Sequence, residues 1–346
     1  MELKDISITK LPAVGPMFKT KFAKHGLHTV VDVLLHGSEE IHTETGMKKD
    51  SADVLVMKAK NYLEEKNLIP KEIMSVREIL DYNKKLEKIP TGSCVFNNML
   101  NGGFEMGHTY SIYGQNGSGK TQIAHNMAVE ALQKKKKVLW LEIENTFRPE
   151  RLIEMIIAKK YAVNEEEALQ LADNIILKRC LDSTVMMDTL NNCTSEIIEQ
   201  NVGLIIVDGA IGKFRLDFRG RGTLSDRQVD VGTFVGRLAK IAFYLGICVI
   251  LTNQVTANLD PYGAKVLPIG GHIVGHFAQY IIYVKKNGEY RTITLKKSSY
   301  IPEHEINVSL TAAGFEDTPE FKKHNGQKLE QVSKLLDDEP QADEQG

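Results

Sequence analysis

The chain has 346 residues, of which 42% are hydrophobic and 25% are charged, and its formal net charge at pH 7 is −2. This composition predicts a core-forming chain of about two domains, and it excludes both overall disorder and a globally basic nucleic-acid binder. Because the sequence shows neither a signal peptide nor an apolar run of ~20 residues, we expect a soluble cytoplasmic protein with no membrane partner.

The first part of the chain predicts a small helical domain over residues 1–65. Residues 11–34, LPAVGPMFKTKFAKHGLHTVVDVL, carry an apolar stripe that is interrupted at Gly15-Pro16 and at Gly26. This pattern indicates short helices joined by tight hairpins. A second turn, TETGMKKD, leads into a helix that is expected to end near EEKNLIP. Residues 66–90 are charged, bounded by prolines and short of apolar periodicity, so we interpret them as a linker.

Residues 91–317 predict an α/β core. The runs KVLWLEIE, GLIIVDG, GICVILTNQ and YIIYVKK are apolar at nearly every position, which is typical of strands covered on both faces. We therefore expect a mostly parallel sheet flanked by helices, with RTITLKK and HEINVSL as antiparallel edge strands. Residues 318–346 are polar and acidic, which predicts a disordered, solvated tail or, alternatively, a docking segment for a partner.

A glycine-rich loop in residues 111–125, SIYGQNGSGKTQIAH, lies between a strand pattern and a helical pattern and fits G-x-x-x-x-G-K-[ST]. Backbone N–H groups of such a loop converge on phosphate oxygens at a helix N-terminus. We expect Lys120 to neutralise the β and γ phosphates and Thr121 to hold Mg²⁺. These flanks favour a nucleoside triphosphate site over a plain glycine-rich turn. The expected nucleotide contacts are Gly114, Gln115, Asn116, Gly117, Ser118, Gly119, Lys120, Thr121 and Gln122.

Polar side chains end three of the apolar runs. Asp208 ends GLIIVD, where the carboxyl end of a parallel strand could present it to Mg²⁺. Glu142 and Glu144 end LWLEIEN, two residues apart, and one of them could act as the base that orients an attacking water. Gln254 ends ILTNQ and could sense a γ-phosphate. The alternative for a single acid of this kind is a helix N-cap.

Two segments after these strands could contact nucleic acid. Residues 212–228, GKFRLDFRGRGTLSDRQ, interleave arginines with Phe214 and Phe218, as a path for single-stranded nucleic acid requires, although a solvated charged loop is the alternative. Residues 255–272, VTANLDPYGAKVLPIGGH, show no periodicity, and a loop of this length in a compact domain is usually functional.

Several segments together resemble the RadA recombinases of archaea and their eukaryotic relatives, the DNA strand-exchange ATPases of the RecA class. They are GQNGSGKTQIAHNMAVEAL, EIENTFRPERL, LIIVDGAIGKFRLDFRGRGTLSDRQ, LTNQV and PIGGHIVGH, and LPAVGP resembles the helix-hairpin-helix at the start of these proteins. The resemblance implies a RecA-like P-loop ATPase core preceded by an all-α helix-hairpin-helix domain. It also implies ATP and Mg²⁺ as cofactors.

The same resemblance implies partners and a cellular role. Copies of the chain would assemble as a helical filament or ring on single-stranded DNA and pair it with homologous double-stranded DNA during recombination and break repair, with mediator proteins as further partners. Such a protein would act at the nucleoid of an archaeon or in the nucleus of a eukaryote. An active recombinase is favoured over a mediator paralogue that binds ATP and DNA without strand exchange, and over a RecA-fold motor such as a ring helicase.

The resemblance also assigns roles to individual residues. Glu144 matches the glutamate that activates water, Arg151 the arginine that stacks on adenine, and Gln254 the amide that links the γ-phosphate to DNA binding. Pro302 matches a proline that covers the base from the adjacent protomer, and Lys297 stands where it could meet the γ-phosphate across that interface. The implied DNA contacts are Arg215, Arg219, Arg221 and Arg227 in the first loop and Leu259, Gly270 and Gly271 in the second.

Two of the departures from the family pattern concern the contact between subunits and the magnesium site. The linker of this family carries an aromatic-x-x-small motif that inserts into the next subunit, whereas this chain has IMSV, from Ile73 to Val76, so we expect a weaker contact between protomers. The serine that usually follows the magnesium-site aspartate is Gly209. Neither change removes a residue that phosphate chemistry needs.

Overall fold

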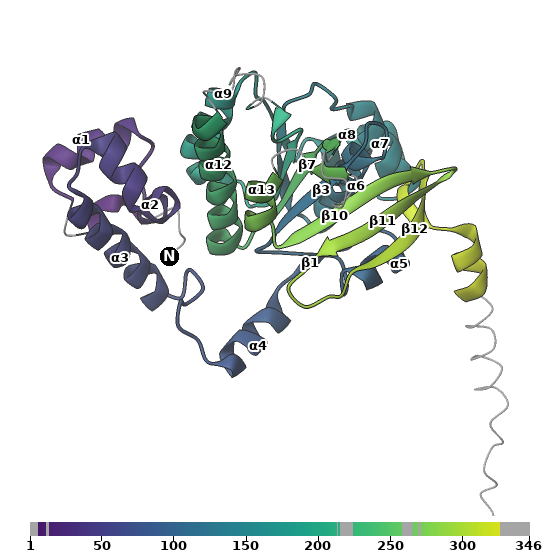
Figure 1. Cartoon of the computed structure of the whole chain (residues 1–346), viewed down its shortest axis with the longest axis horizontal. Coiled ribbons are helices and arrows are strands. Elements are labelled where there is room, and N and C mark those ends of the chain that lie inside the picture. The colour runs from purple at the N-terminus through teal and green to yellow at the C-terminus, as the bar shows by residue number, and fades with distance from the viewer. Residues whose placement is uncertain are drawn as a thin grey trace, which may run out of the picture.

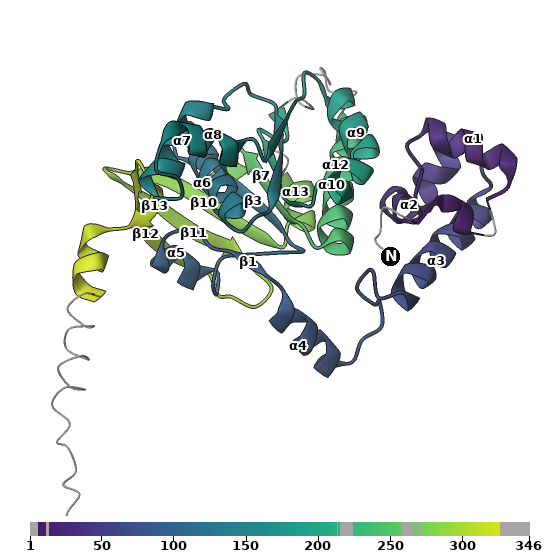
Figure 2. The same cartoon turned by 180° about the vertical axis from the view of Figure 1, so that it is seen from behind.

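The structure is a computed structural model, and it describes residues 6–11, 14–212, 214, 224–257, 266–268 and 271–325. Figure 1 shows a group of helices at one end of the chain and a larger part built on a sheet, with helix α4 (Val76–Lys85) on the connection between them. The same two parts are seen from behind in Figure 2.

The N-terminal part consists of α1 (Pro16–Lys24), α2 (Val30–Thr45) and α3 (Lys49–Glu65), which follow a short 3-10 turn, η2 (Ile8–Lys10). A capping box begins α2, because Thr29 Oγ1 accepts the Asp32 N–H and the Asp32 carboxylate accepts the Thr29 N–H. Gly37, with φ of 78°, kinks α2. Apolar side chains of all three helices form one buried cluster, so short helices lie where the sequence predicts them.

Helix α4 lies in the linker, where apolar periodicity did not predict a helix. It also begins at a capping box: Ser75 Oγ accepts the Glu78 N–H at 3.3 Å, and the Glu78 carboxylate accepts the Ser75 N–H at 2.7 Å. None of its residues is buried, so no face of α4 needed an apolar stripe. The capping sequence S-x-x-E was the signal for this helix.

The larger part is built on one nine-stranded sheet in the order β13-β12-β11-β10-β3-β7-β6-β4-β5. The strands from β10 to β5 pair in parallel, and β11, β12 and β13 continue the sheet in antiparallel pairing, which confirms the predicted α/β class and mostly parallel sheet. The strands are β3 (Thr109–Gly114), β4 (Lys137–Glu142), β5 (Ile175–Arg179), β6 (Val202–Asp208), β7 (Cys248–Asn253), β10 (Tyr280–Asn287), β11 (Tyr290–Lys297), β12 (His304–Thr311) and β13 (Gly314–Asp317).

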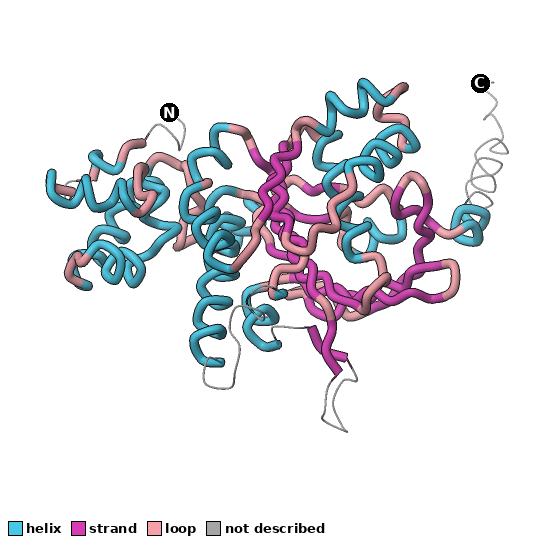
Figure 3. Tube along the Cα trace, turned by 90° about the horizontal axis from the view of Figure 1, so that it is seen from above, coloured by secondary structure: helices cyan, strands magenta, loops and turns pink. Residues whose placement is uncertain are grey.

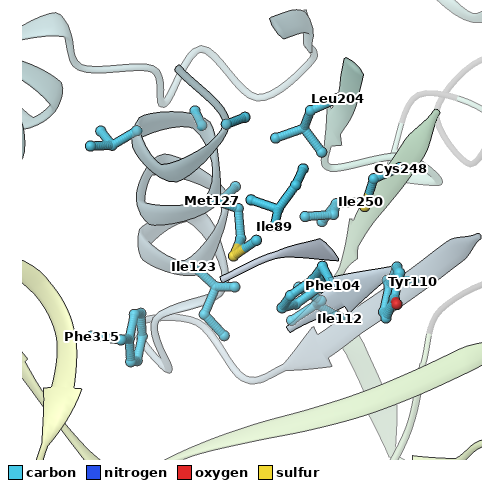
Figure 4. Close-up of a cluster of buried hydrophobic side chains, with 14 of the residues drawn as sticks. Ile89, Phe104, Tyr110, Ile112, Ile123, Met127, Leu204, Cys248, Ile250 and Phe315 are labelled. Atoms are coloured by element: carbon cyan, nitrogen blue, oxygen red, sulfur yellow. The ribbon is translucent and has the colours of Figure 1, made fainter. Parts of the chain in front are cut away.

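Helices cover both faces of this sheet (Figure 3). One face packs against α5 (Cys94–Met99), α6 (Lys120–Gln133), α7 (Pro149–Ala158) and α8 (Glu165–Ala172). The other packs against α9 (Ser183–Asn192), α10 (Thr194–Glu199), α12 (Leu224–Leu245) and α13 (Gly271–Phe277). Strand β4 shows why its residues are apolar throughout: Val138 and Trp140 enter the first core cluster, and Leu139 and Leu141 enter the second. Figure 4 shows part of the first cluster, including Ile123 and Met127 of α6.

Some elements differ from the sequence-based expectation. The loop expected over residues 255–272 contains β8 (Val255–Ala257) and β9 (Val266–Pro268), which pair antiparallel, and its end enters α13. Residues 319–325, expected to belong to the solvated tail, are helical. A two-stranded ladder, β1 (Lys88–Ile89) with β2 (Phe104–Glu105), lies beside α5. No helix in the described part of the chain is long and apolar enough to cross a membrane.

Candidate nucleotide-binding site

The phosphate loop connects the buried strand β3 to the N-terminus of α6. Gly119, with φ of 111°, is the N-cap of α6, and Gly117 has φ of 71° with no other atom within 4 Å of where a Cβ would stand. At Gly114 a Cβ would stand 2.3 Å from the Val284 carbonyl oxygen, so only glycine fits between β3 and β10. The loop therefore keeps a backbone surface that a phosphate can approach.

Lys120, the first residue of α6, lies over this loop. Its Nζ donates to the carbonyl oxygens of Gly114 and Gln115, both at 3.0 Å. Burial lowers the pKa of Lys120, and the nearby carboxylates of Glu144 and Asp208 oppose that shift. The ammonium group is thus held at the loop with two carboxylates close by.

Asp208, the last residue of β6, is buried at the centre of a group of hydroxyls. Its carboxylate accepts hydrogen bonds from Thr121 Oγ1 at 3.3 Å, from Thr146 Oγ1 at 3.0 Å and from Thr252 Oγ1. The sheet register places Asp208 directly beside Thr252 of β7 and Glu142 of β4. Sequence reasoning missed Thr146 and Thr252, although each stands within a few residues of a predicted site residue, in the segments ENTF and LTNQ.

Glu142 and Glu144 have different surroundings. Strand β4 ends at Glu142, so the strand alternation that would place both on one face stops there. The Glu142 carboxylate is buried and accepts the N–H groups of Thr146 and Phe147 at 2.8 and 2.9 Å. Glu144 accepts a hydrogen bond from Gln254 Nε2 at 3.0 Å. Burial and the Asp208 charge raise the pKa of Glu144.

The phosphate loop and most of these side chains, although not Glu142, line one pocket of about 360 Å³. Its lining includes the phosphate loop from Asn116 to Gln122 except Ser118, together with Glu144, Asp208 and Gln254. The residues fit a magnesium-bound triphosphate: Ser118 Oγ is buried at the loop without a hydrogen-bond partner, and Asp208 and Thr121 offer the oxygen ligands that Mg²⁺ prefers. The structure thus brings together the predicted phosphate, magnesium and catalytic residues.

Arg151, in α7, connects α6 to the end of β12. Its Nε donates to Gln122 Oε1 at 2.8 Å, and its Nη atoms donate to the carbonyl oxygens of Thr311 at 2.6 Å and Ala312 at 3.0 Å. These bonds, with one to Glu154, hold the guanidinium plane next to the last residues of β12. That position is compatible with the stacking role that the resemblance implies.

Lys297 and Pro302 do not line the pocket of their own chain. Lys297, at the end of β11, donates from Nζ to the carbonyl oxygens of Gly275 and Ala278, at 2.6 and 2.9 Å. Pro302 is exposed between β11 and β12. Contact of either residue with a nucleotide would require a second copy of the chain, as the resemblance implies.

Most of the expected DNA contacts lie outside the described residues, namely Arg215, Arg219, Arg221, Leu259 and Gly270. Arg227 lies in α12, and Gly271 is the first residue of α13. In the linker, Ile73 and Val76 are 89% and 85% exposed, so both side chains are free to enter a neighbouring subunit.

The chain is similar to known recombination proteins along most of its length. The model of the Rad51 family matches residues 82–318. The chain is 33% identical over 331 residues to the DNA repair and recombination protein RadA of Cenarchaeum symbiosum (strain A), in an alignment that covers 93% of this chain and 82% of that protein. It is 32% identical over 330 residues to the DNA repair protein Rad51 homolog of Drosophila melanogaster, with 91% and 94% of the two chains covered.

Proposed function

This chain belongs to the Rad51 family of RecA-class recombinases, and we propose that it hydrolyses ATP, in the presence of DNA, to drive the exchange of DNA strands. One observation supports this proposal above the others: Glu144 lies in the same pocket as Lys120 and Asp208, with Gln254 donating to its carboxylate. A protein that only binds nucleotide needs the phosphate loop. This site also has a carboxylate that can act as a base, Glu144, and an amide hydrogen-bonded to it, Gln254.

The residues divide the work of ATP hydrolysis between them. The N–H groups of the loop and the Lys120 ammonium bind the β and γ phosphates. Thr121 and Asp208 are the residues that would hold Mg²⁺, which would supply positive charge to the phosphate oxygens. Glu144 orients the attacking water and accepts its proton, a role for which a raised pKa is suited. Gln254, hydrogen-bonded to Glu144, lies immediately before β8, so a shift of this amide at the γ-phosphate would reach the second DNA loop directly.

Assembly completes the proposal. Residues 1–65 form the helix-hairpin-helix domain, residues 66–90 form a linker that joins neighbouring copies through Ile73 and Val76, and residues 91–317 form the ATPase core. The high exposure of both linker side chains supports this role, because the free energy falls when a partner covers apolar groups that are exposed to water. Mg²⁺, ATP, single-stranded DNA and double-stranded DNA are the proposed ligands.

A homologous pairing assay tests the function. An oligonucleotide is incubated with a supercoiled duplex that contains its sequence, with and without ATP, and joint molecules are counted. We expect joint molecules only with ATP, and none from Lys120→Ala, which removes the main positive partner of the triphosphate. ATP hydrolysis stimulated by DNA without any joint molecule would instead favour a mediator paralogue.

A further inference from the structure

Arg291, on β11, lines the same pocket as the phosphate loop, although no motif singled it out. Its Nε is buried and has no hydrogen-bond partner. A Cβ built on Gly119 would stand 3.5 Å from this Nε, so the arginine lies against the loop itself. Its Nη1 donates to the carbonyl oxygen of Tyr290 at 3.0 Å.

The charge of Arg291 has no counter-charge within the described part of the chain. None of the ion pairs found there includes it. A partly buried charged donor without a counter-charge destabilises the protein, so a bound anion that pairs with it would bind favourably. The planar guanidinium matches phosphate oxygens better than any other cationic side chain.

The order of the strands indicates which phosphate Arg291 faces. Strand β3, which carries the loop, has β7 and β6 on one side and β10, β11 and β12 on the other. Asp208, proposed for Mg²⁺, is the last residue of β6, and Gln254, proposed for the γ-phosphate, directly follows β7. Arg291 and Leu310 line the pocket from β11 and β12, on the opposite side of the loop, where Arg151 also lies. That side belongs to the nucleoside end of the ligand.

We propose that Arg291 binds the α-phosphate of the nucleotide and supplies affinity that ATP, ADP and AMP share. This inference rests on the proposed ATP site and adds a residue to it. An α-phosphate is present before and after hydrolysis, so a contact made there strengthens the binding of substrate and product alike. Lys120, by contrast, serves the phosphates that distinguish ATP from AMP.

Titration calorimetry with ATP, ADP and AMP tests the assignment, using unmodified protein, Arg291→Ala, Arg291→Lys and Lys285→Ala. Lys285 is an exposed cation on the neighbouring strand β10 and does not line the pocket, so its loss is a matched control for charge. We expect Arg291→Ala to weaken all three nucleotides by a similar factor of about tenfold or more, Arg291→Lys to recover part of the loss, and Lys285→Ala to bind normally.

Thermal unfolding separates binding from packing. We expect Arg291→Ala to melt close to the unmodified protein without nucleotide, and to lose most of the rise in Tm that ADP produces. A loss confined to ATP would place Arg291 at the γ-phosphate and overturn the inference, as would normal ADP affinity combined with a lowered Tm. If Arg291→Ala binds all three nucleotides as tightly as the unmodified protein does, only this inference fails. An unmodified protein that binds no nucleotide would overturn the proposed function first.

Discussion

The carboxylates around the phosphate loop differ in what they bind, and this difference separates structural from chemical roles. Glu142 accepts two backbone N–H groups and so fixes the turn from β4 toward α7. Glu144 has one side-chain donor, Gln254, and lines the pocket. Two backbone N–H groups hold a carboxylate in one position, whereas a carboxylate with a single amide partner is freer to reach a water molecule.

Replacing each glutamate by glutamine tests this division. We expect Glu144→Gln to keep nucleotide affinity and to slow hydrolysis by ~10² or more, because the base is lost and the shape is kept. Glu142→Gln should lower Tm, since one of its two charge-assisted bonds is weakened at a cost of ~1–3 kcal/mol, with a smaller effect on turnover. Steady-state ATPase rates, nucleotide Kd values and melting curves check both. If Glu142→Gln costs more turnover than Glu144→Gln, the roles are reversed.

Gly209 shapes the position of Glu144. Its φ is 88°, and a Cβ there would stand 2.5 Å from Glu144 Cγ. Gly209→Ala should therefore displace the glutamate and add ~1–2 kcal/mol of backbone strain. We expect hydrolysis to fall about tenfold with nucleotide affinity little changed. Gly212→Ala is the control, because a Cβ there lies 3.9 Å from Glu144 Oε1; equal effects of the two variants would show that Glu144 is not the group affected.

At the scale of elements, the sequence predicts those strands and loops whose structure depends on residues close together in the chain. The buried strands β4, β6, β7 and β10 and the phosphate loop were predicted because apolar runs and a glycine motif are read within a few residues. Helix α4 was missed because it is exposed on all sides, so that only its cap carries a signal. The separation of Glu142 from Glu144 depends on where β4 ends, which the hydrogen bonds of the following turn determine.

Long-range contacts carry no local signal at all. Several contacts join segments that are far apart in the sequence. Lys297 binds the end of α13, Arg291 lines the nucleotide pocket, and three threonines donate to Asp208 at the end of β6. The family resemblance gave candidate roles for some of these residues, although it did not indicate which atoms they contact within the chain.

Lys297 stabilises the C-terminal end of α13. Its ammonium binds the carbonyl oxygens of Gly275 and Ala278, at the negative end of the helix dipole, a position worth ~0.3–1 kcal/mol for a cation. Helix α13 directly follows the segment proposed as the second DNA loop. We expect Lys297→Ala to increase amide hydrogen exchange in α13 and to weaken ATP-dependent DNA binding several-fold, while nucleotide affinity stays within about twofold.

Two comparisons make this prediction specific. Lys296→Ala removes the neighbouring cation, which pairs with Glu303 instead, and should leave exchange in α13 unchanged. Because the Lys297 ammonium already occupies the helix end, DNA-stimulated ATP hydrolysis by the unmodified protein should be similar in potassium and in sodium at equal ionic strength. Strong activation by potassium, or a Lys297→Ala variant that behaves like Lys296→Ala, would contradict the assignment.

At the scale of the whole molecule, the N-terminal helices are joined to the core by a buried polar contact. Arg237 of α12 is 2% exposed, and its guanidinium contacts Glu40 of α2 and Asn191 of α9. Lys240 Nζ donates to the carbonyl oxygens of Leu35 and His36 at 3.1 and 3.3 Å, next to the kink at Gly37. Leu35 itself packs within the second core cluster. These contacts define a docked position for the N-terminal helices.

Glu40→Gln should release the N-terminal helices from the core. The substitution leaves the buried Arg237 guanidinium without its counter-charge, which typically costs several kcal/mol. Since ~1.4 kcal/mol changes an equilibrium tenfold, this cost is enough to shift the helices from the docked to the released state. Energy transfer between dyes on Cys94, the exposed cysteine of the core, and on an introduced Lys58→Cys in α3 measures the distance. We expect lower transfer in Glu40→Gln. The control is Glu39→Gln, at the residue before Glu40, which alters only an exposed ion pair with Lys49 and should match the unmodified protein. Equal transfer in Glu40→Gln and Glu39→Gln would disprove the contact.

His36 makes this docking depend on pH. It lies beside Arg237 and close to Lys240, and its Nδ1 lies 2.9 Å from the Asp32 carbonyl oxygen. Burial, followed by the Arg237 charge, lowers the pKa of His36 from 6.5 to about 3. Docked His36 therefore stays neutral at a pH where the released side chain would gain a proton, so docking is fully favoured above about pH 6.5 and weakens as the pH falls toward 3.

The size of the effect follows from the same pKa difference. If release restores the ordinary pKa of 6.5, the released state gains at most about 2 kcal/mol at pH 5 relative to pH 7, or about thirtyfold in the equilibrium between docked and released helices. Burial also raises the pKa of Glu40, and protonation of this docked carboxylate opposes the release at lower pH. We expect energy transfer between Cys94 and Lys58→Cys to fall from pH 7 to pH 5 in the doubly labelled protein, and to vary much less in a His36→Gln variant, whose side chain cannot titrate. Transfer that falls equally in both proteins would show that another group controls the docking.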